Sequence, residues 1–340
     1  MRAISAADAI SPAIQRTKEF LFRPFSWGTY LKLGLVAMIT EGFGSNMRSS
    51  SHGSHPAEHG PMVYSPFNLP PLWIAAIAAA VLLAIVVSIF VFYLITRLRF
   101  AFFHCLIHNT REIRPGWWFY REQATRFFWL SLMVGFGFLL LVAVIALPFV
   151  AGFWRLFHET PPGTQPNVVA LLSLALPLIP IIFLLVLAGF LADLILRDWM
   201  LPHFALEDAT AGEAWSGVWA RIKAEKAQFF AYALLRVVLP VIAMIGLVVV
   251  LMIPGLILAG SYAAFEYGLH SAFANATGSA AVAGVLLQVF FGLVTFGIAL
   301  LASICLGGPL STWVREYALT FYGGRYRALG DILYPPSPAS

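Results

Sequence analysis

The residues with the most obvious capacity for chemistry are three potential metal ligands on one short segment. His104, His108 and Glu112 follow one another at intervals of four residues, so a continuous helix would present them on one face. Imidazole and carboxylate groups bind zinc, but a tight site needs three or four convergent ligands that further hydrogen bonds orient. Because polar residues and Pro115 interrupt the helical pattern soon afterwards, we expect interfacial histidines here and no metal site.

A second group of histidines lies in the segment 45–70. His52, His55 and His59 are interspersed with Gly, Ser and Pro, and such tracts bind metals only weakly. We expect a low-complexity loop. The chain contains no P-loop, dinucleotide fingerprint, HExxH motif or nucleophile elbow. We therefore predict no catalytic residue, cofactor or metal.

Charged residues inside apolar stretches are costly and therefore informative. Asp193 lies near the end of one apolar stretch and Arg236 near the start of the next, so the two side chains could neutralise each other. Local partners, Arg197 for Asp193 or lipid headgroups for either residue, are the simpler alternative. A sharper hypothesis is a polar gate, because prolines interrupt both stretches and free carbonyls that can line a substrate cavity.

The composition identifies the solvent in which these residues act. Of 340 residues, 60% are hydrophobic and 11% are charged, and the mean hydropathy is +0.83. A soluble protein carries charge on about a quarter of its residues, so lipid is the expected solvent. The net charge of +5 is scattered between apolar blocks, which is not the pattern of a nucleic-acid-binding domain. The two cysteines and the amino terminus indicate neither a disulfide nor a cleaved signal peptide.

Six apolar stretches are long enough to predict membrane helices. A spanning helix needs about 20 apolar residues to cross about 30 Å of hydrocarbon, and backbone hydrogen bonding requires it to be helical. The first stretch is the weakest, because it is short and contains Lys32. We predict an all-α, polytopic membrane protein with six transmembrane helices in three hairpins, within a single domain 1–333. The predicted helices cover about 27–44, 72–96, 127–153, 168–196, 229–260 and 281–306.

The basic residues predict the orientation, because cytoplasmic segments retain Lys and Arg. If both termini and the segments after the second and fourth helices face the cytoplasm, only Arg48 and Arg155 lie on the opposite side. This distribution favours an even number of crossings, with the amino and carboxyl termini cytoplasmic. We expect the tail 334–340 to be disordered.

Each odd-numbered membrane helix is preceded by a basic, amphipathic segment. These segments cover about 5–22, 115–126 and 210–226, and in the third Thr210 and Glu213 match a capping box. Helices of this type lie in the headgroup plane, with aromatic rings at the acyl boundary and basic side chains toward phosphates. The predicted anchors are Trp117, Trp118, Arg121, Trp215, Trp219 and Arg221.

The last two of these units are alike in more than outline. Each runs from a tryptophan-rich segment through an Arg to a Phe pair, Phe127 with Phe128 and Phe229 with Phe230. This pattern indicates three copies of one module, an interfacial helix followed by a transmembrane hairpin. The alternative is that every membrane helix needs aromatic and basic anchors at its cytoplasmic end, which produces the similarity without duplication.

Two segments carry a resemblance to a known group of proteins. The segment from Leu201 to Phe230 combines a Pro after a membrane helix, a short acidic stretch, and Ala-Trp opening a basic helix that leads into Phe-Phe. The segment from Ala9 to Leu35 places a helix before an Arg-Pro-Phe entry to the first span. Both segments resemble uncharacterised bacterial and archaeal six-helix membrane proteins, which look similar to the membrane domain associated with some glycerophosphodiester phosphodiesterases.

The resemblance implies a membrane module in a bacterial cytoplasmic (inner) membrane and carries over no catalytic residues. A phosphodiesterase would also need a soluble catalytic barrel, for which the chain has no room. We therefore expect a non-enzymatic membrane module that binds lipids or partner proteins. The alternatives are a transporter or exporter subunit for a small molecule or lipid, and a membrane-embedded enzyme acting on lipids. Membrane lipids are the expected partners, other membrane proteins or a second copy remain open, and no nucleic acid is expected.

Overall fold

The computed structural model describes residues 4–42, 71–159, 167–273 and 278–335. His52, His55 and His59, and the predicted tail from residue 336 onward, lie outside these ranges. The described part of the chain is all-helical, in agreement with the predicted class. Its elements are α1 Ile10–Phe22, α2 Trp27–Ala37, η1 Met38–Gly42, α4 Pro71–Ile107, α5 Ile113–Phe119, α6 Arg121–Glu159, α7 Val168–Ala175, α8 Leu178–Leu194, η2 Ile195–Met200, α9 Leu201–Leu206, α10 Ala211–Ala224, α11 Lys226–Phe273, α12 Ser279–Gly323 and α13 Arg327–Leu333.

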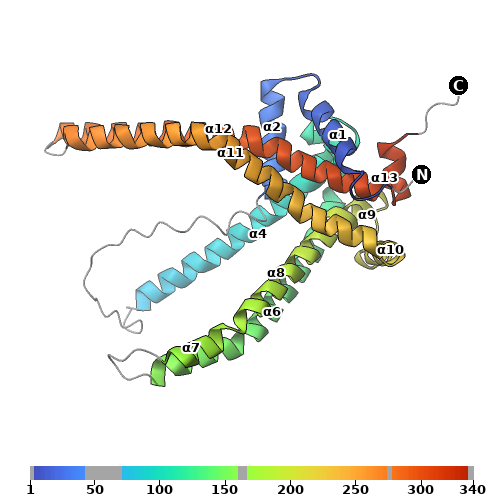
Figure 1. Ribbon diagram of the computed structural model, residues 1–340, viewed down its shortest axis with the longest axis horizontal. Coiled ribbons are helices and arrows are strands. Elements are labelled where there is room, and N and C mark those ends of the chain that lie inside the picture. The colour runs from blue at the N-terminus through green and yellow to red at the C-terminus, as the bar shows by residue number, and fades with distance from the viewer. Residues whose placement is uncertain (1–3, 43–70, 160–166, 274–277, 336–340) are drawn as a thin grey trace.

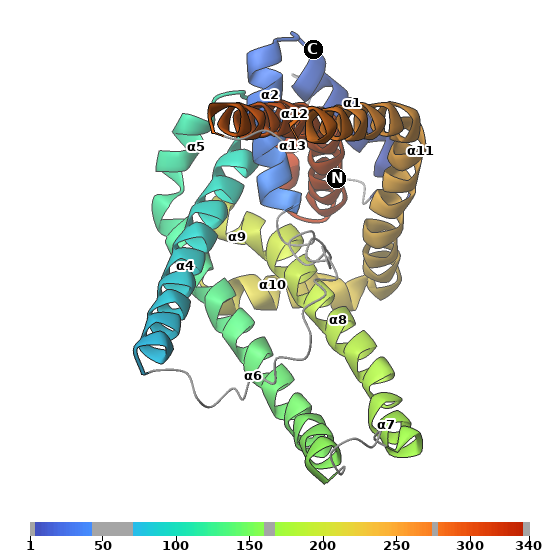
Figure 2. The same ribbon diagram turned by 90° about the vertical axis from the view of Figure 1, so that its left-hand side faces the viewer.

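The helices form a compact head from which three legs diverge (Figure 1). The head contains the short helices α1, α2, α5, α9, α10 and α13 together with the adjoining ends of the long helices. The legs are the helix α4, the pair formed by α6 with α7 and α8, and the pair formed by α11 and α12 (Figure 2). The described ends of the chain, at residues 4 and 335, both lie at the head (Figure 1).

The core lies in the head and is rich in aromatic side chains. Phe127 of α6 packs edge-on against Phe100 of α4 and Phe204 of α9, with ring centroids 5.5 and 5.4 Å apart. Tyr232 of α11 stacks on Phe321 of α12 at 4.4 Å. Edge-to-face and offset-stacked pairs stabilise a core beyond the area they bury. The long helices are therefore fixed to one another at their head ends.

A polar contact in the head joins the two ends of the chain. The Arg16 guanidinium of α1 donates to the Glu316 carboxylate of α12 at 3.1 Å. It also donates to the carbonyl oxygens of Leu333 at 3.3 Å and Leu106 at 3.4 Å. One side chain of α1 thus contacts α12 and the last residues of α13 and α4.

Five described helical segments are long and apolar enough to cross a membrane. They are Leu72–Ile107, Arg121–Glu159, Val168–Leu206, Lys226–Phe273 and Val282–Gly323. Within the protein, their most apolar windows are 0 to 6% buried. Each segment exceeds the predicted apolar stretch. Helix α4 continues into the head to Ile107 and α12 to Gly323, whereas α11 extends mainly at its far end, to Phe273.

The first predicted membrane stretch, 27–44, is helical over Trp27–Gly42. The 11 residues of α2 and the five of η1 make 16, about 24 Å at 1.5 Å per residue, which is short of a bilayer's hydrocarbon thickness. The helix packs closely on α12, because a Cβ added at Gly308 would lie 2.6 Å from the Cα of Gly34. Glycine at both positions allows this crossing.

The segments predicted to be interfacial helices take three different forms. Helix α1 buries Ala13, Thr17, Phe20 and Leu21 and packs on α12. The segment 115–126 divides between α5 and the first turns of α6. Helix α10 has the predicted capping box: the Thr210 hydroxyl accepts from the Glu213 N–H, and the Glu213 carboxylate accepts from the Thr210 N–H.

Candidate functional site

Two π-helical segments supply the polar groups of the candidate site. A π-turn shifts the regular backbone hydrogen-bond pattern, and such turns are frequent at functional sites. In η1, the Thr40 carbonyl accepts from Arg99 Nε at 3.2 Å and from Arg197 Nη2 at 3.0 Å. In η2, the Arg197 carbonyl accepts from Arg315 Nη1 at 2.8 Å. Arginines from three helices therefore converge on two backbone carbonyls.

Carboxylates of the same two segments complete what we term the charged cluster. Glu41 of η1 accepts from Arg197 at 2.7 Å and from Arg236 of α11 at 3.3 Å. Asp198 of η2 accepts from Arg236 at 2.9 Å and from Arg315 of α12 at 3.2 Å, and also from the Tyr232 hydroxyl at 2.8 Å. The charged cluster comprises Glu41, Asp193, Arg197, Asp198, Arg236 and Arg315.

Asp193 and Arg236, the predicted pair, both belong to this cluster. None of the ion pairs among the described residues joins the two side chains directly. Asp193 Oδ2 accepts from Arg197 Nη1 at 3.0 Å, one helical turn away. Arg236 instead donates to Asp198 and Glu41. Because Arg197 also binds Glu41, it connects Asp193 to Arg236. Arg197, the local partner considered for Asp193 from the sequence, is its partner in the structure.

The charged cluster forms the floor of a large cavity between the legs. The cavity has a volume of about 1720 Å³, and its walls come from α6, α8, α11 and α12. Most lining side chains are aliphatic or aromatic, and Pro240 and Pro254 of α11 are among them. Glu41, Asp193, Arg197, Asp198 and Arg236 line its charged end. An apolar chamber with convergent charges at one end is the usual form of a small-molecule site.

Comparison with known proteins identifies the family. The chain matches the family of unknown function DUF7544 over residues 4–332. It belongs to this family. No curated protein and no solved structure matches the chain. The resemblance to the membrane domain associated with glycerophosphodiester phosphodiesterases stays a prediction.

Sequence reasoning missed half of the DUF7544 protein's charged cluster. Glu41 was counted as part of a weak apolar stretch, and Arg315 lies beyond the predicted end of the last one. Both have less than a tenth of the side chain exposed. One sequence feature could have identified the missed residues: isolated charges, Asp198 among them, occur close to apolar stretches. Sequence spacing does not show that these positions meet.

The anchors predicted in 115–126 lie on the outside of the head. The Arg97 guanidinium is 4.4 Å from the centroid of the Trp117 ring and donates to the Trp117 carbonyl at 2.7 Å. Trp118 and Arg121 are exposed. The contacts of Arg97 fix the segment that carries Trp118, so this ring projects from a rigid part of the head.

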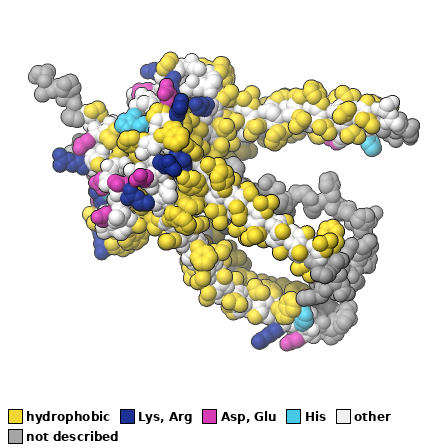
Figure 3. All heavy atoms as spheres, turned by 180° about the vertical axis from the view of Figure 1, so that it is seen from behind, with side chains coloured by type: hydrophobic (Ala, Val, Ile, Leu, Met, Phe, Trp, Pro, Cys, Tyr) yellow, Lys and Arg dark blue, Asp and Glu magenta, His cyan; other side chains and the backbone are white. Residues whose placement is uncertain are grey.

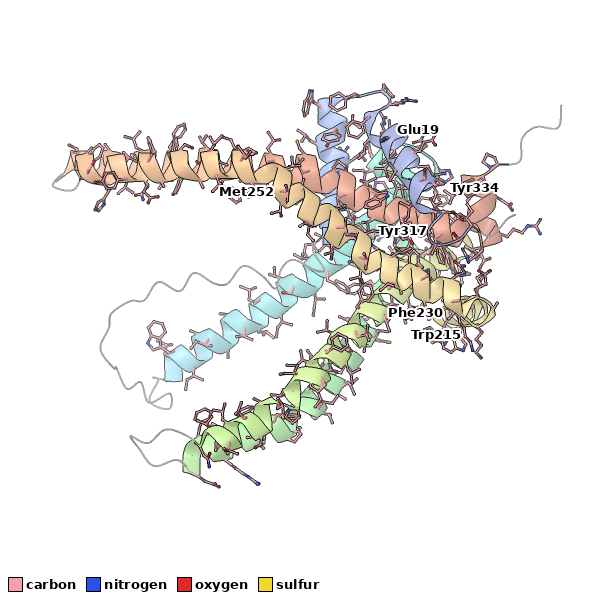
Figure 4. All side chains as sticks on the ribbon, in the orientation of Figure 1. Glu19, Trp215, Phe230, Met252, Tyr317 and Tyr334 are labelled. Atoms are coloured by element: carbon pink, nitrogen blue, oxygen red, sulfur yellow. The ribbon has the colours of Figure 1, made fainter. Side chains whose placement is uncertain are left out.

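The anchors predicted in 210–226 separate into an exposed pair and an internal residue. Trp215 and Trp219 stack with centroids 5.8 Å apart and remain exposed. Figure 4 shows Trp215 on α10 and Phe230, the exposed member of its Phe pair, on α11. Arg221 turns inward: it donates to the Gly217 carbonyl at 2.7 Å, and its guanidinium is 5.0 Å from the Tyr326 ring.

The histidines considered as metal ligands lie at the end of α4. The His104 and His108 ring centroids are 4.5 Å apart. Across the described ranges, no three His, Cys, Asp or Glu side chains are grouped so that they could hold a metal ion.

Proposed function

We propose that this DUF7544 protein is a non-enzymatic membrane protein that binds a membrane lipid in the cavity between α6, α8, α11 and α12. The observation that carries the proposal is the polarity of the cavity, whose walls are apolar and whose floor is the charged cluster. A lipid has the same polarity, with acyl chains for the walls and a charged headgroup for the floor. Because lipid tails surround the legs, acyl chains that fill such walls pack against them through van der Waals contacts.

The position of the charged cluster supports access from the membrane. Asp193 and Arg236 lie near the head ends of α8 and α11, where these helices leave their apolar stretches. The exposed apolar side chains of the legs need lipid around them, because no water-soluble surface covers them in the described structure. A headgroup at the level of the cluster therefore belongs to the leaflet next to the head.

We assign the head to the cytoplasmic side of a bacterial inner membrane. Helices α1 and α13 both pack on the head end of α12. Lys and Arg side chains gather on the head in Figure 3, as cytoplasmic segments do under the positive-inside rule. With both termini on that side, the chain makes an even number of passages. Our proposal is six, the first of them involving α2 and η1.

A cavity-filling substitution tests lipid binding. Gly255 of α11 lines the cavity, and a Cβ built there meets no atom within 4 Å, so the side chain of Gly255→Trp begins in open space at the cavity wall. Gly260 on the same helix has equally open surroundings but does not line the cavity, and Gly260→Trp is the matched control.

The readout is crosslinking of a phospholipid that carries a photoactivatable acyl chain. In nanodiscs, we expect crosslinks to α11 peptides that contain Met244 and Leu251, both of which line the cavity. Gly255→Trp should remove these crosslinks and Gly260→Trp should retain them. Equal labelling in both variants would show that the lipid contacts only the outer surface of the legs, and the proposal would be wrong.

A transporter is the alternative, and the prolines of α11 favour it. Pro240 and Pro254 line the cavity within a continuous helix, and an internal proline frees a carbonyl and permits bending. Such a helix can open the cavity to either side of the membrane. Lipid movement between leaflets of proteoliposomes that requires the protein and is slowed by Asp193→Asn would favour the transporter over the binding module.

A further inference from the structure

The hydrogen-bonding capacity left unused by the charged cluster lies on residues that line the cavity. Arg236 uses Nε and Nη2 for Asp198 and Glu41, while its Nη1 takes part in no hydrogen bond among the described residues. Asp193 uses Oδ2 for Arg197, and its side chain is 56% exposed. A guanidinium offers five N–H donors and a carboxylate two acceptor oxygens. The floor thus retains a free N–H donor group on Arg236 and a free acceptor oxygen on Asp193.

One buried donor beside the floor has no partner. The Nε atom of Arg197 is buried and has no partner among the described residues, and Arg197 as a whole is 6% exposed. With less than 1 Å² of accessible surface, this atom does not face the cavity and does not bind a ligand there. Both Nη atoms of Arg197 already donate to acceptors within the protein, so Arg236 is the arginine that offers a free donor at the floor.

The remaining charges of the floor are already satisfied. The side chains of Glu41 and Asp198 are 6% and 1% exposed, and each accepts from at least two arginine nitrogens. Asp193 is therefore the most accessible negative charge at the floor. A headgroup with an anionic oxygen alone would satisfy Arg236 but would be repelled by Asp193.

We infer that the lipid in the cavity is a phospholipid whose headgroup carries both a phosphodiester and a primary ammonium, the phosphatidylethanolamine class. Arg236 donates through Nη1 to a phosphodiester oxygen, and the Asp193 carboxylate accepts from the ammonium. A choline headgroup has a quaternary nitrogen without N–H donors, and a glycerol headgroup has no positive charge, so neither satisfies Asp193. This inference rests on the proposed function, because it specifies the lipid of that site.

Competition against the photoactivatable phospholipid tests the inference. The competitors are phosphatidylethanolamine, phosphatidylcholine and phosphatidylglycerol with identical acyl chains, and inorganic phosphate. We expect phosphatidylethanolamine to displace the probe at a concentration about tenfold lower than the other lipids, the ratio that one charge-assisted hydrogen bond supplies. Inorganic phosphate lacks acyl chains and should displace little.

The informative variant is Asp193→Asn, because a half-exposed residue can be replaced without burying an unpaired charge. It should remove the preference for phosphatidylethanolamine over phosphatidylcholine while lipid binding persists. The control Glu122→Gln removes an exposed carboxylate of the head that does not line the cavity and should retain the preference.

The outcomes separate the two proposals. If no lipid protects the cavity from the probe, the proposed function itself is wrong. If lipids bind without a preference for phosphatidylethanolamine, or if Asp193→Asn leaves that preference intact, lipid binding stands and the headgroup assignment is overturned. Displacement by inorganic phosphate as effective as by lipid would also overturn it, because the floor would then take a free anion.

Discussion

At the scale of single residues, Glu41 carries a buried charge that neighbouring arginines must stabilise. Its side chain is 6% exposed and lies against two arginines, Arg197 and Arg236, from different helices. Burying charges costs several kcal/mol per ion, and mutual attraction and hydrogen bonds must offset that cost. The geometry around Glu41 supplies both, so its charge matters more than its volume.

We predict that Glu41→Gln destabilises the protein severely. The substitution keeps the size of the side chain but removes the carboxylate that Arg197 and Arg236 share, so that Arg197 keeps only Asp193 and Arg236 only Asp198. Breaking a buried ion pair costs about 3–5 kcal/mol. Thermal unfolding in a mild detergent should show a large loss of stability, whereas Glu122→Gln at an exposed position of α6 should unfold like the native protein. Similar stability of the two variants would contradict the role given to Glu41.

The charged cluster also shows what sequence can predict about individual residues. Asp193 and Arg236 were identifiable because each interrupts an apolar stretch and is costly there. Their partners were not, since Glu41 lies in a short stretch more than a hundred residues away in sequence. Periodicity reports which side chains share a helix face, but it contains no information on which distant helix packs against that face.

At the scale of elements, the crossing of α2 and α12 depends on two glycines. We predict that Gly308→Ala destabilises this crossing by about 1–3 kcal/mol, the usual cost of overpacking. Its Cβ would lie 2.6 Å from the Gly34 Cα, so the helices must separate. Gly297→Ala on the same helix places its Cβ in open space and should be neutral or stabilising in the same unfolding assay. Equal stability of both variants would show that the crossing tolerates separation.

The start of α10 predicts a dependence on pH. The Glu213 carboxylate accepts hydrogen bonds from the N–H and the hydroxyl of Thr210, which lowers the pKa of this carboxyl. A lowered pKa means that the capping interaction is fully present above the ordinary Glu pKa and is lost as the pH falls through the lowered value. Hydrogen exchange, corrected for its intrinsic pH dependence, should report fraying of the first turn of α10 in acid.

Two variants check the origin of this pH dependence. Glu213→Gln should give a first turn whose protection no longer changes over that range, because no carboxylate remains to titrate. Thr210→Ala should weaken the pH dependence without removing it, because the backbone N–H of residue 210 still donates to the Glu213 carboxylate. Unchanged pH dependence in Glu213→Gln would assign the effect to another group. The capping box itself was predicted from sequence, since its residues are three apart and their geometry is local. The head ends of α4 and α12 were not, because packing in the head extends them beyond their apolar stretches.

At the scale of the whole molecule, the core and the membrane-facing surface occupy different ends. The head is held by buried aromatic side chains, whereas the apolar windows of the five long segments are 0 to 6% buried. The composition predicted lipid as the solvent of the long helices, and five described segments are long and apolar enough to cross a membrane. The divergence of the legs (Figures 1 and 2) and the cavity between them were not predictable, because hydropathy gives the length of a membrane helix but not its neighbours.

We predict that the protein stays in the membrane pellet after extraction with alkaline carbonate, and that it aggregates when detergent is diluted below its critical micelle concentration. The physical reason is the uncovered apolar surface of the legs, since large exposed apolar patches associate in water. Sedimentation followed by immunoblotting measures both outcomes. Release of folded monomer into the supernatant would be incompatible with legs surrounded by lipid.

The Arg16 contacts have a consequence for biosynthesis. Arg16 leaves the ribosome 300 residues before Glu316 and 317 residues before Leu333, which supply two of its partners. Helix α1 cannot make these contacts until α12 and α13 have been synthesised. A nascent chain that stops before α12 therefore leaves the Arg16 guanidinium without these two acceptors.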